Sequence, residues 1–208
     1  MTTPEADAIF DRFDVSRESR QKIETYVTLL LSWQQRINLI GPATVSNVWQ
    51  RHICDSLQLL PLLPQNASKI AELGSGAGIP GLILAMAAGL EAHLYESNGK
   101  KAAFLREAAR QTGTKAVVHN VRLESLGDES SLPEVQVVVA RALAPLPLLL
   151  DYAAPFLSRG AIGLFHKGQD VDTELTEATK YWRIEVLKHA SQCDSRGFIL
   201  EIREASRV

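Results

Sequence analysis

Cysteine is scarce in this sequence: Cys54 and Cys193 are the two examples among 208 residues, and they lie far apart. Zinc-binding motifs and disulfide frameworks both need several cysteines at short, regular spacings. A chain of this length buries enough apolar surface to fold without covalent cross-links. We therefore expect no metal site and no disulfide, as is usual in the reducing cytoplasm.

Long apolar runs are also missing. A membrane-spanning helix needs about 18 or more apolar residues, and the longest candidate, 79–90, is interrupted by Pro80, Gly81 and Gly89. The first residues are acidic and lack the basic-then-apolar order of a signal peptide. The sequence therefore predicts a cytoplasmic protein with no membrane partner.

A strong charge of one sign is absent too. The 22 basic and 24 acidic residues give a net charge of −2, which argues against a general nucleic-acid coat protein. The charges are nevertheless uneven, because residues 61–120 hold six basic and four acidic side chains. A specific RNA partner therefore stays open. Hydrophobic residues at 46% and charged residues at 22% exclude a disordered chain.

The first 66 residues have a helical pattern. One apolar stripe recurs at about 3.6-residue spacing, and Ser16 precedes it as a candidate N-cap; the stripe comprises Ile23, Tyr26, Val27, Leu30 and Ile37. Gly41-Pro42 breaks the pattern, and a second helix is predicted from Thr44 to just before Pro61. We expect residues 1–66 to form an N-terminal helical extension.

From residue 67 onward, predicted strands and helices alternate. Apolar runs predict strands at 69–73, 92–96, 115–120, 135–141 and 161–167, and helical patterns fill 81–88, 100–111, 147–157 and 170–180. The run 135–141 is apolar enough for a strand buried on both faces. Two final runs, 182–189 and 197–203, predict an antiparallel hairpin. Residues 67–208 are therefore expected to form a Rossmann-like, doubly wound α/β domain.

A glycine-rich segment, ELGSGAGIPG (72–81), lies between the first predicted strand and the next helix. Gly74, Gly76 and Gly78 would let the backbone turn sharply and approach a ligand closely. Ligands of open α/β sheets bind at the carboxyl ends of the strands, where this loop would lie. The alternative is a tight strand–helix turn that binds nothing.

Glu96 ends the second predicted strand, 22 residues after Gly74. A carboxylate there can accept hydrogen bonds from a ribose diol. The alternative is an acidic residue that favours the start of the following helix. Both roles are compatible with one side chain.

The acid before the glycines separates two kinds of nucleotide site. Glu72 precedes Gly74 by two residues, and a carboxylate there would repel the pyrophosphate of a dinucleotide. S-adenosylmethionine carries an ammonium and a sulfonium, which a carboxylate attracts. The terminal hairpin also suits the seven-stranded methyltransferase sheet. A dinucleotide-dependent oxidoreductase is the alternative, although little chain remains for a second substrate domain.

Several further motifs, in order, resemble the bacterial RsmG (GidB) family of 16S ribosomal RNA guanine-N7 methyltransferases. They span almost the whole chain: WQQRINL (33–39), RHICDS (51–56), ELGSGAGIPG (72–81), ESNGKKAAFLR (96–106), VRLE (121–124), VARA (139–142) and HKG (166–168). The resemblance implies a class I S-adenosylmethionine-dependent methyltransferase. It would methylate N7 of one guanine, conventionally G527 in the 530 loop of 16S rRNA, within the small ribosomal subunit or an assembly intermediate. Another S-adenosylmethionine-dependent methyltransferase is the alternative.

The resemblance also assigns residues. Gly74 and Ile79 would contact the cofactor on the glycine loop, Leu123 and Glu124 would lie beside its adenine, and Arg141 would lie beside the methyl-transfer centre. Glu72 and Glu96 stand where the family often has aspartate.

Guanine N7 carries a lone pair and no proton, so the attack on the methyl group needs no general base. Catalysis would come mainly from proximity and orientation. Because the product base is cationic, we expect Arg141 to bind guanine O6 or a phosphate, or to shape the site through a carboxylate pair.

The segment RHICDS carries further catalytic candidates. On a helix, Arg51 and Asp55 share a face, as do His52 and Ser56. Taken alone, the pattern favours an ordinary Arg51–Asp55 ion pair and a packed histidine. The resemblance instead implies that His52 and Asp55 line the cleft.

Basic side chains supply the candidate RNA contacts: Arg51, Lys100, Lys101, Arg106 and Lys167. For the helix residues among them, the alternative is a solvated helix face. Nothing indicates a large apolar interface, so we expect a monomer.

Overall fold

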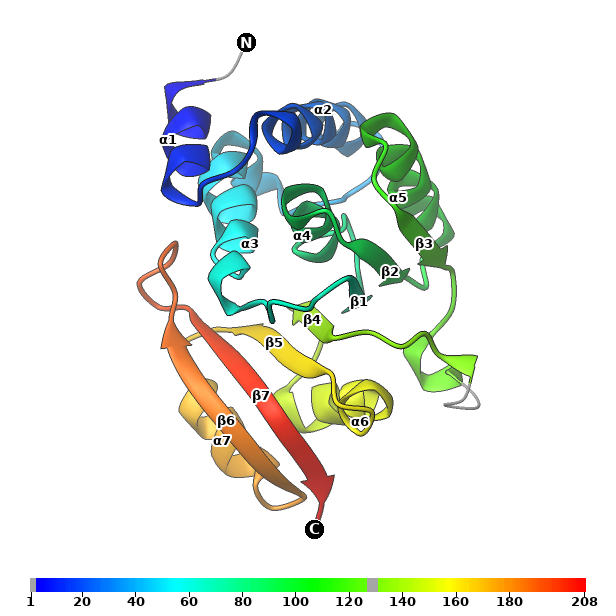
Figure 1. Ribbon diagram of the computed structural model, residues 1–208, viewed down its shortest axis with the longest axis vertical. Coiled ribbons are helices and arrows are strands. Elements are labelled where there is room, and N and C mark those ends of the chain that lie inside the picture. The colour runs from blue at the N-terminus through cyan, green and yellow to red at the C-terminus, as the bar shows by residue number, and fades with distance from the viewer. Residues whose placement is uncertain (1–2, 127–130) are drawn as a thin grey trace.

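The computed structural model describes residues 3–126 and 131–208. Within them, seven strands form one sheet in the order β3-β2-β1-β4-β5-β7-β6 (Figure 1). Strands β1 to β5 are parallel, and β7 runs antiparallel to both β5 and β6. Their bounds are β1 Lys69–Leu73, β2 Glu91–Tyr95, β3 Ala116–His119, β4 Val137–Arg141, β5 Ile162–Lys167, β6 Trp182–Ala190 and β7 Phe198–Arg207. The predicted parallel strands and the antiparallel hairpin are thus confirmed.

Helices cover both faces of the sheet, as a doubly wound fold requires. On one face lie α4 (Gly81–Ala88) and α5 (Gly99–Thr112), and on the other lie α6 (Leu146–Leu157) and α7 (Val171–Ala178) (Figure 1). A short 3-10 turn, η4 (Leu123–Ser125), follows β3. Residues 137–140 of β4 are buried, which confirms a strand covered on both faces.

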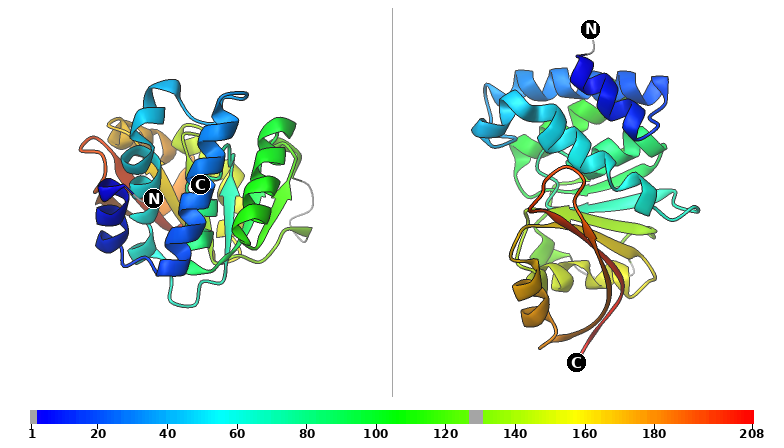
Figure 2. Two further views of the ribbon diagram at one scale, coloured as in Figure 1. Left: turned by 90° about the horizontal axis from the view of Figure 1, so that it is seen from above. Right: turned by 90° about the vertical axis from the view of Figure 1, so that its left-hand side faces the viewer.

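The N-terminal residues form a further helical layer over α4 and α5 (Figure 2). It contains α1 (Pro4–Arg12) and α2 (Arg17–Gln34), and the Ser16 side chain accepts a hydrogen bond from the Ser19 amide, which confirms the predicted N-cap. Ile37 lies beyond the end of α2 and is only partly buried, so its predicted place in the helical stripe is wrong.

The second helical stretch, predicted from near Thr44 to just before Pro61, is mostly helical but is not one regular α-helix. The chain instead forms four short pieces: η1 (Pro42–Asn47), the π-helical η2 (Trp49–Cys54), α3 (Asp55–Leu57) and η3 (Leu60–Leu62). Pro42 and Pro61 occupy first-turn positions of η1 and η3, where proline fits without losing a hydrogen bond. The π-turn shifts the side-chain register in the segment that carries Arg51, His52 and Asp55.

The N-terminal layer and the sheet share one hydrophobic core. Tyr26 and Leu30 of α2 belong to the same buried cluster as Leu82 of α4, Phe104 of α5 and Ile70 of β1. A boundary between domains at residues 66 and 67 therefore stays a prediction. None of the described helices has the length and apolarity to span a bilayer.

Candidate functional site

The glycine loop turns sharply after β1, as its sequence predicts. Gly74, Gly76 and Gly78 have φ angles of +65°, +55° and +82°, which side chains other than glycine rarely adopt. A Cβ atom on Gly74 would come within 2.5 Å of Leu143 Cδ1. The loop is joined to β2 by the Ser75 amide, which donates to the Tyr95 carbonyl oxygen at 2.9 Å. These positions therefore require glycine for conformation and, at Gly74, for space.

Glu96 holds both the glycine loop and the start of α5. Its Oε2 accepts from the Gly76 amide and its Oε1 from the Asn98 amide, both at 2.7 Å. The residue is 7% exposed. A carboxylate offers about four lone-pair sites, so this one retains acceptor capacity beyond the two backbone amides.

A cavity of about 310 Å³, here called the loop cavity, opens beside these residues. It lies at the carboxyl ends of β1, β2 and β4, the usual ligand position in this architecture. Tyr95 lines it, and the Tyr95 hydroxyl is buried without a hydrogen-bond partner. Its walls bring together several predicted cofactor residues: Gly74, Gly76, Glu96, Leu123 and Glu124.

Glu72 lies behind the glycine loop and does not line the loop cavity, so its direct contact with a cofactor stays a prediction. Its Oε1 accepts from the Gly81 amide at 2.8 Å, at the first turn of α4, while its Oε2 is buried without a partner. Burial raises the Glu72 pKa to about 8, against the lowering effect of that hydrogen bond. A Cβ on Gly81 would lie 2.8 Å from the Glu72 Cβ, so the two residues are tightly packed.

Two further loop residues, Gly78 and Ile79, also lie off the cavity wall. A Cβ on Gly78 would approach Leu82 and Leu105 within 3 Å, so this glycine lets the loop pack against α4 and α5. Ile79 is partly buried against the hydrophobic core. Direct cofactor contacts by these two residues stay predictions.

A second cavity, of about 370 Å³, lies at the carboxyl ends of β4 and β5 and is here called the arginine cavity. Arg141 ends β4, and its Nη1 lies 3.2 Å from Asp55 Oδ2. Burial lowers the Arg141 pKa, and Asp55 opposes that shift. His166 Nε2 donates to the Asp55 carbonyl oxygen at 2.8 Å. Arg141 and Asp55, two predicted catalytic residues, are thus brought together.

His52, the third candidate, is near this group but absent from the cavity wall. Its Nε2 is hydrogen-bonded to Thr44 Oγ1 at 2.8 Å. Burial, followed by the positive charges of Arg141 and Arg51, lowers the His52 pKa to about 4. The imidazole is therefore neutral at pH 7 and adds no charge beside Arg141.

The Arg51–Asp55 ion pair that the four-residue spacing favours is not formed. Arg51 Nη1 instead lies 2.5 Å from Asp194 Oδ2, in the loop between β6 and β7. Gln58 binds the same loop, because its Oε1 accepts from the Gln192 amide at 2.8 Å. Arg51 therefore contributes to the arginine cavity through a residue 143 positions away.

The expectation of no disulfide is wrong as well: Cys54 and Cys193 are joined. The tip of the β6–β7 hairpin folds back toward the helical segment that contains η2 and α3 (Figure 1). Because 139 residues separate the two cysteines, their spacing gave no sign of this approach. The disulfide fixes the loop that forms one wall of the arginine cavity.

Lys167 lines the arginine cavity, but its amine is occupied. The Nζ donates to Glu174 Oε2 at 2.6 Å and to the Ala144 carbonyl oxygen at 2.9 Å. The side chain is 6% exposed. A phosphate or base contact by Lys167 stays a prediction, and its direct contacts in this structure are with Glu174 and the Ala144 carbonyl oxygen.

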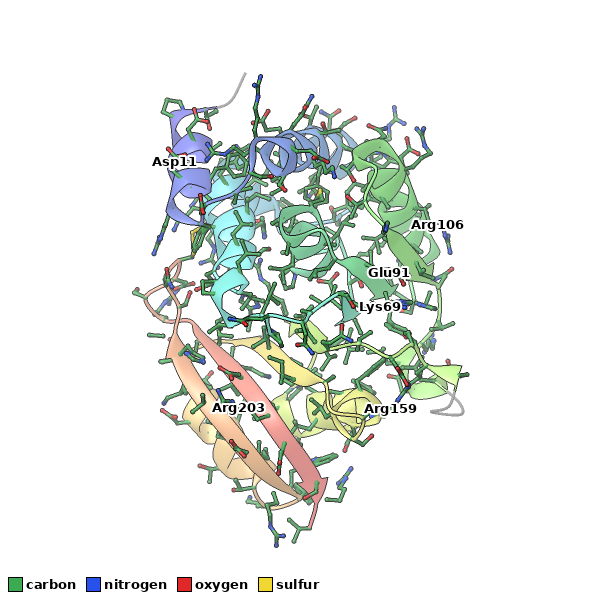
Figure 3. All side chains as sticks on the ribbon, viewed as in Figure 1. Asp11, Lys69, Glu91, Arg106, Arg159 and Arg203 are labelled. Atoms are coloured by element: carbon green, nitrogen blue, oxygen red, sulfur yellow. A yellow bond between two sulfur atoms is a disulfide. The ribbon has the colours of Figure 1, made fainter. Side chains whose placement is uncertain are left out.

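The cations of α5 are accessible. Lys100 and Arg106 are exposed, Lys101 is partly so, and Figure 3 shows Arg106 at the outer side of the molecule. Lys101 also lines the loop cavity, as does Arg122. Arg36 and Asn38 line a further hollow together with Lys100 and Lys101. Arg36, Asn38 and Arg122 lie inside recognised motifs, but nothing in their spacing marked them as site residues.

Among the described residues, no group of three or more histidine, cysteine, aspartate or glutamate side chains has the arrangement of a metal site.

The sequence is similar to a family of known proteins over most of its length. A family model described as "GidB: rRNA small subunit methyltransferase G" matches residues 19–197. The ribosomal RNA small subunit methyltransferase G of Rhodospirillum rubrum is 50% identical over 206 residues, covering 99% of this chain and 100% of the relative. The protein of the same name from Bradyrhizobium sp. (strain ORS 278) is 50% identical over 194 residues, covering 90% of this chain and 86% of that relative.

Solved structures share the architecture at low sequence identity. M. jannaschii TYW2 in complex with AdoMet aligns with a TM-score of 0.55 and 10% identity, over 84% of this chain and 80% of that chain. The class I methyltransferase fold predicted from the sequence is confirmed. By its matched family model and its curated relatives, the chain belongs to the GidB family, rRNA small subunit methyltransferase G.

Proposed function

We propose that this protein transfers a methyl group from S-adenosylmethionine to guanine N7 of 16S rRNA, at G527 in the 530 loop. Membership of the GidB family supports rRNA methylation. The observation that carries the proposal is that two cavities meet at one short segment. Ala142 borders the arginine cavity, and Leu143 and Ala144 border the loop cavity. A donor in one cavity can therefore lie beside an acceptor in the other.

The residues of the loop cavity fit S-adenosylmethionine. Glu96 keeps acceptor capacity for a ribose diol. Leu123, Leu143 and Leu148 give the cavity apolar walls suited to an adenine ring. When bound, S-adenosylmethionine supplies an electrophilic methyl group.

The residues of the arginine cavity fit a guanine. The Arg141 side chain is 18% exposed, with its Nη1 buried beside Asp55, and the guanidinium lines the cavity. It can donate to guanine O6, as arginine commonly does, provided that the contact leaves N7 free. Asp55 offsets the positive charge of Arg141, which favours a base that becomes cationic on methylation.

Proximity and orientation would carry the chemistry. Guanine N7 loses no proton, so neutral His52 and His166 are not required as bases. Their pKa values are lowered mainly by burial, and their neutrality keeps further positive charge away from the product. Lys100, Lys101 and Arg106 would bind RNA phosphates beside the loop cavity.

The test incubates the purified protein and methyl-labelled S-adenosylmethionine with small ribosomal subunits from cells that lack this gene, and separately with naked 16S rRNA. The label is then mapped on the RNA. Label at N7 of a single guanine in the 530 loop is expected with the native protein and not with Gly76→Val, which places a β-branched residue at a φ angle of +55° in the wall of the loop cavity. Label at another position, or none while the cofactor still binds, would overturn the assigned substrate.

A further inference from the structure

We propose that Tyr26, in the N-terminal helix α2, is a positioning residue that holds the glycine loop in its cofactor-binding geometry. The inference rests on the proposed function, because it assigns that loop to cofactor binding. Within the apolar stripe of α2, Tyr26 was predicted only as a core residue. Its polar contact gives it a second role.

The contact is made by a single buried hydroxyl. Tyr26 Oη donates to the Ala77 carbonyl oxygen at 2.7 Å, across 51 residues of sequence. Tyr26 is 0% exposed, and Ala77 is 4% exposed. Ala77 lies between Gly76 and Gly78, both of which have positive φ angles. The hydroxyl therefore fixes the loop by a hydrogen bond at Ala77, between its two left-handed glycines.

The hydroxyl is itself fixed in place. The Tyr26 ring packs on Phe104 of α5 with centroids 6.0 Å apart, and Trp33 packs on the same Phe104 at 5.6 Å. Burial, together with the nearby carboxylate of Glu72, raises the Tyr26 pKa well above its ordinary value. The group therefore stays protonated and donates its hydrogen bond throughout the physiological pH range.

The hydrogen bond from Tyr26 constrains the peptide group between Ala77 and Gly78. The Ala77 carbonyl and the Gly78 amide belong to the same peptide, and that amide donates to the Ser75 carbonyl oxygen at 2.6 Å. Fixing the carbonyl thus fixes the hydrogen bond that closes the turn. Glu96, the residue that follows β2, holds the neighbouring Gly76 amide. The loop is therefore held from two sides, by the sheet and by the N-terminal layer.

Loss of the hydroxyl would leave the Ala77 carbonyl buried without its partner. A buried acceptor without a donor is unfavourable, so the peptide would rotate or the loop would loosen. Either change displaces Gly74 and Gly76, which line the loop cavity. The apolar packing of a phenylalanine at position 26 would otherwise be unchanged.

The test compares Tyr26→Phe with Ile23→Val. Ile23 lies one turn earlier on the buried face of α2 and is 0% exposed, so its substitution perturbs the same core without touching the loop. Calorimetry with S-adenosylmethionine and S-adenosylhomocysteine should give a cofactor Kd roughly 5- to 10-fold higher for Tyr26→Phe, the loss expected of one buried hydrogen bond. The Ile23→Val Kd should equal that of the native protein, although both variants melt at lower temperature.

Two further readouts separate positioning from general destabilisation. At saturating cofactor, kcat of Tyr26→Phe should stay within about twofold of native, since positioning affects binding first. Without cofactor, amide exchange at 74–81 should accelerate in Tyr26→Phe and not in Ile23→Val. An unchanged Kd and unchanged exchange in Tyr26→Phe would overturn the role of Tyr26. Failure of the native protein to bind either compound would instead overturn the proposed function.

Discussion

The two cavities of this protein are built in different ways. The loop cavity is bounded by short runs at the ends of strands, and backbone amides hold its Glu96 and its glycines in place. The arginine cavity draws Arg51, Arg141 and Asp194 from three distant parts of the chain, and side-chain pairs and a disulfide hold it together. The loop cavity is therefore held mainly by hydrogen bonds to backbone groups, including the one from Tyr26, whereas the arginine cavity depends on long-range contacts between side chains.

This difference determines which substitutions should do damage, and where. Removing one partner of a buried ion pair leaves an uncompensated charge, which is far more costly than losing an exposed pair. Changes in the arginine cavity should therefore spread to its distant partners and leave the loop cavity intact.

The largest expected effect follows from Arg141→Ala. Without the guanidinium, Asp55 keeps a partly buried charge that has lost its ion-pair partner, and the proposed guanine contact is lost. We expect kcat/KM for methylation to fall at least about 10²-fold, the scale of a misplaced reacting group. The cofactor Kd should change less than about threefold. If calorimetry and rates show equal losses, Arg141 serves the loop cavity and the separation of the two cavities fails.

Breaking the disulfide tests the long-range construction directly. Cys193→Ser should lower the free energy of unfolding by roughly 2–5 kcal/mol, because the disulfide closes a long loop in the unfolded chain. The cofactor Kd should be unchanged, whereas KM for the RNA substrate should rise as the β6–β7 loop gains freedom. Native protein treated with dithiothreitol is the control and should behave in the same way. A changed cofactor Kd with an unchanged KM for the RNA substrate would show that the disulfide supports the loop cavity and not the arginine cavity.

Glu72→Gln tests the support of the loop cavity through its pH dependence. The folded-state pKa of Glu72 is raised to about 8, so the folded protein holds a proton that the unfolded chain releases near pH 4.5. The resulting stability is present at low pH and is lost as pH rises through about 8. Between pH 6 and 9, native protein should lose on the order of 2 kcal/mol of unfolding free energy relative to Glu72→Gln. Parallel denaturation curves across that range would show that Glu72 is not protonated.

The smallest expected effect belongs to the exposed cations. Lys100→Glu should weaken RNA binding and reduce the slope of log K against log salt by about 1, as expected for one lost phosphate contact. Lys115→Glu is the matched control, since Lys115 is exposed but lies just before β3, at the amino ends of the parallel strands, whereas Lys100 begins α5 beyond the carboxyl end of β2. Equal slopes for both variants would assign the α5 cations to an ordinary solvated helix face.

The same contrast explains what could be predicted from the sequence. The glycine loop, Glu96 and the alternating strands follow from local patterns, because residue type and spacing determine a turn or a strand. The partners of Arg51 and of Cys54 do not follow, since each lies in the β6–β7 loop more than 130 residues away. Lys167 had the expected position, but its ion pair with Glu174 depends on the packing of α7. The place of Tyr26 in the apolar stripe predicted burial, but the spacing did not indicate that its hydroxyl would bond the Ala77 carbonyl oxygen.

The close packing of Glu72 against Gly81 has a consequence for how this sequence can change over time. Pro80 gives α4 no side-chain cap, and the Glu72 carboxylate takes the Gly81 amide in its place. A Cβ at position 81 would lie within 2.9 Å of the Glu72 carboxylate. Aspartate at 72 would remove the contacts with the carboxylate but would keep the Cβ that lies 2.8 Å away, so alanine at 81 also requires the backbone at one of the two positions to shift. The residues tolerated at positions 72 and 81 should therefore depend on each other, so a substitution at one position changes which substitutions are tolerated at the other.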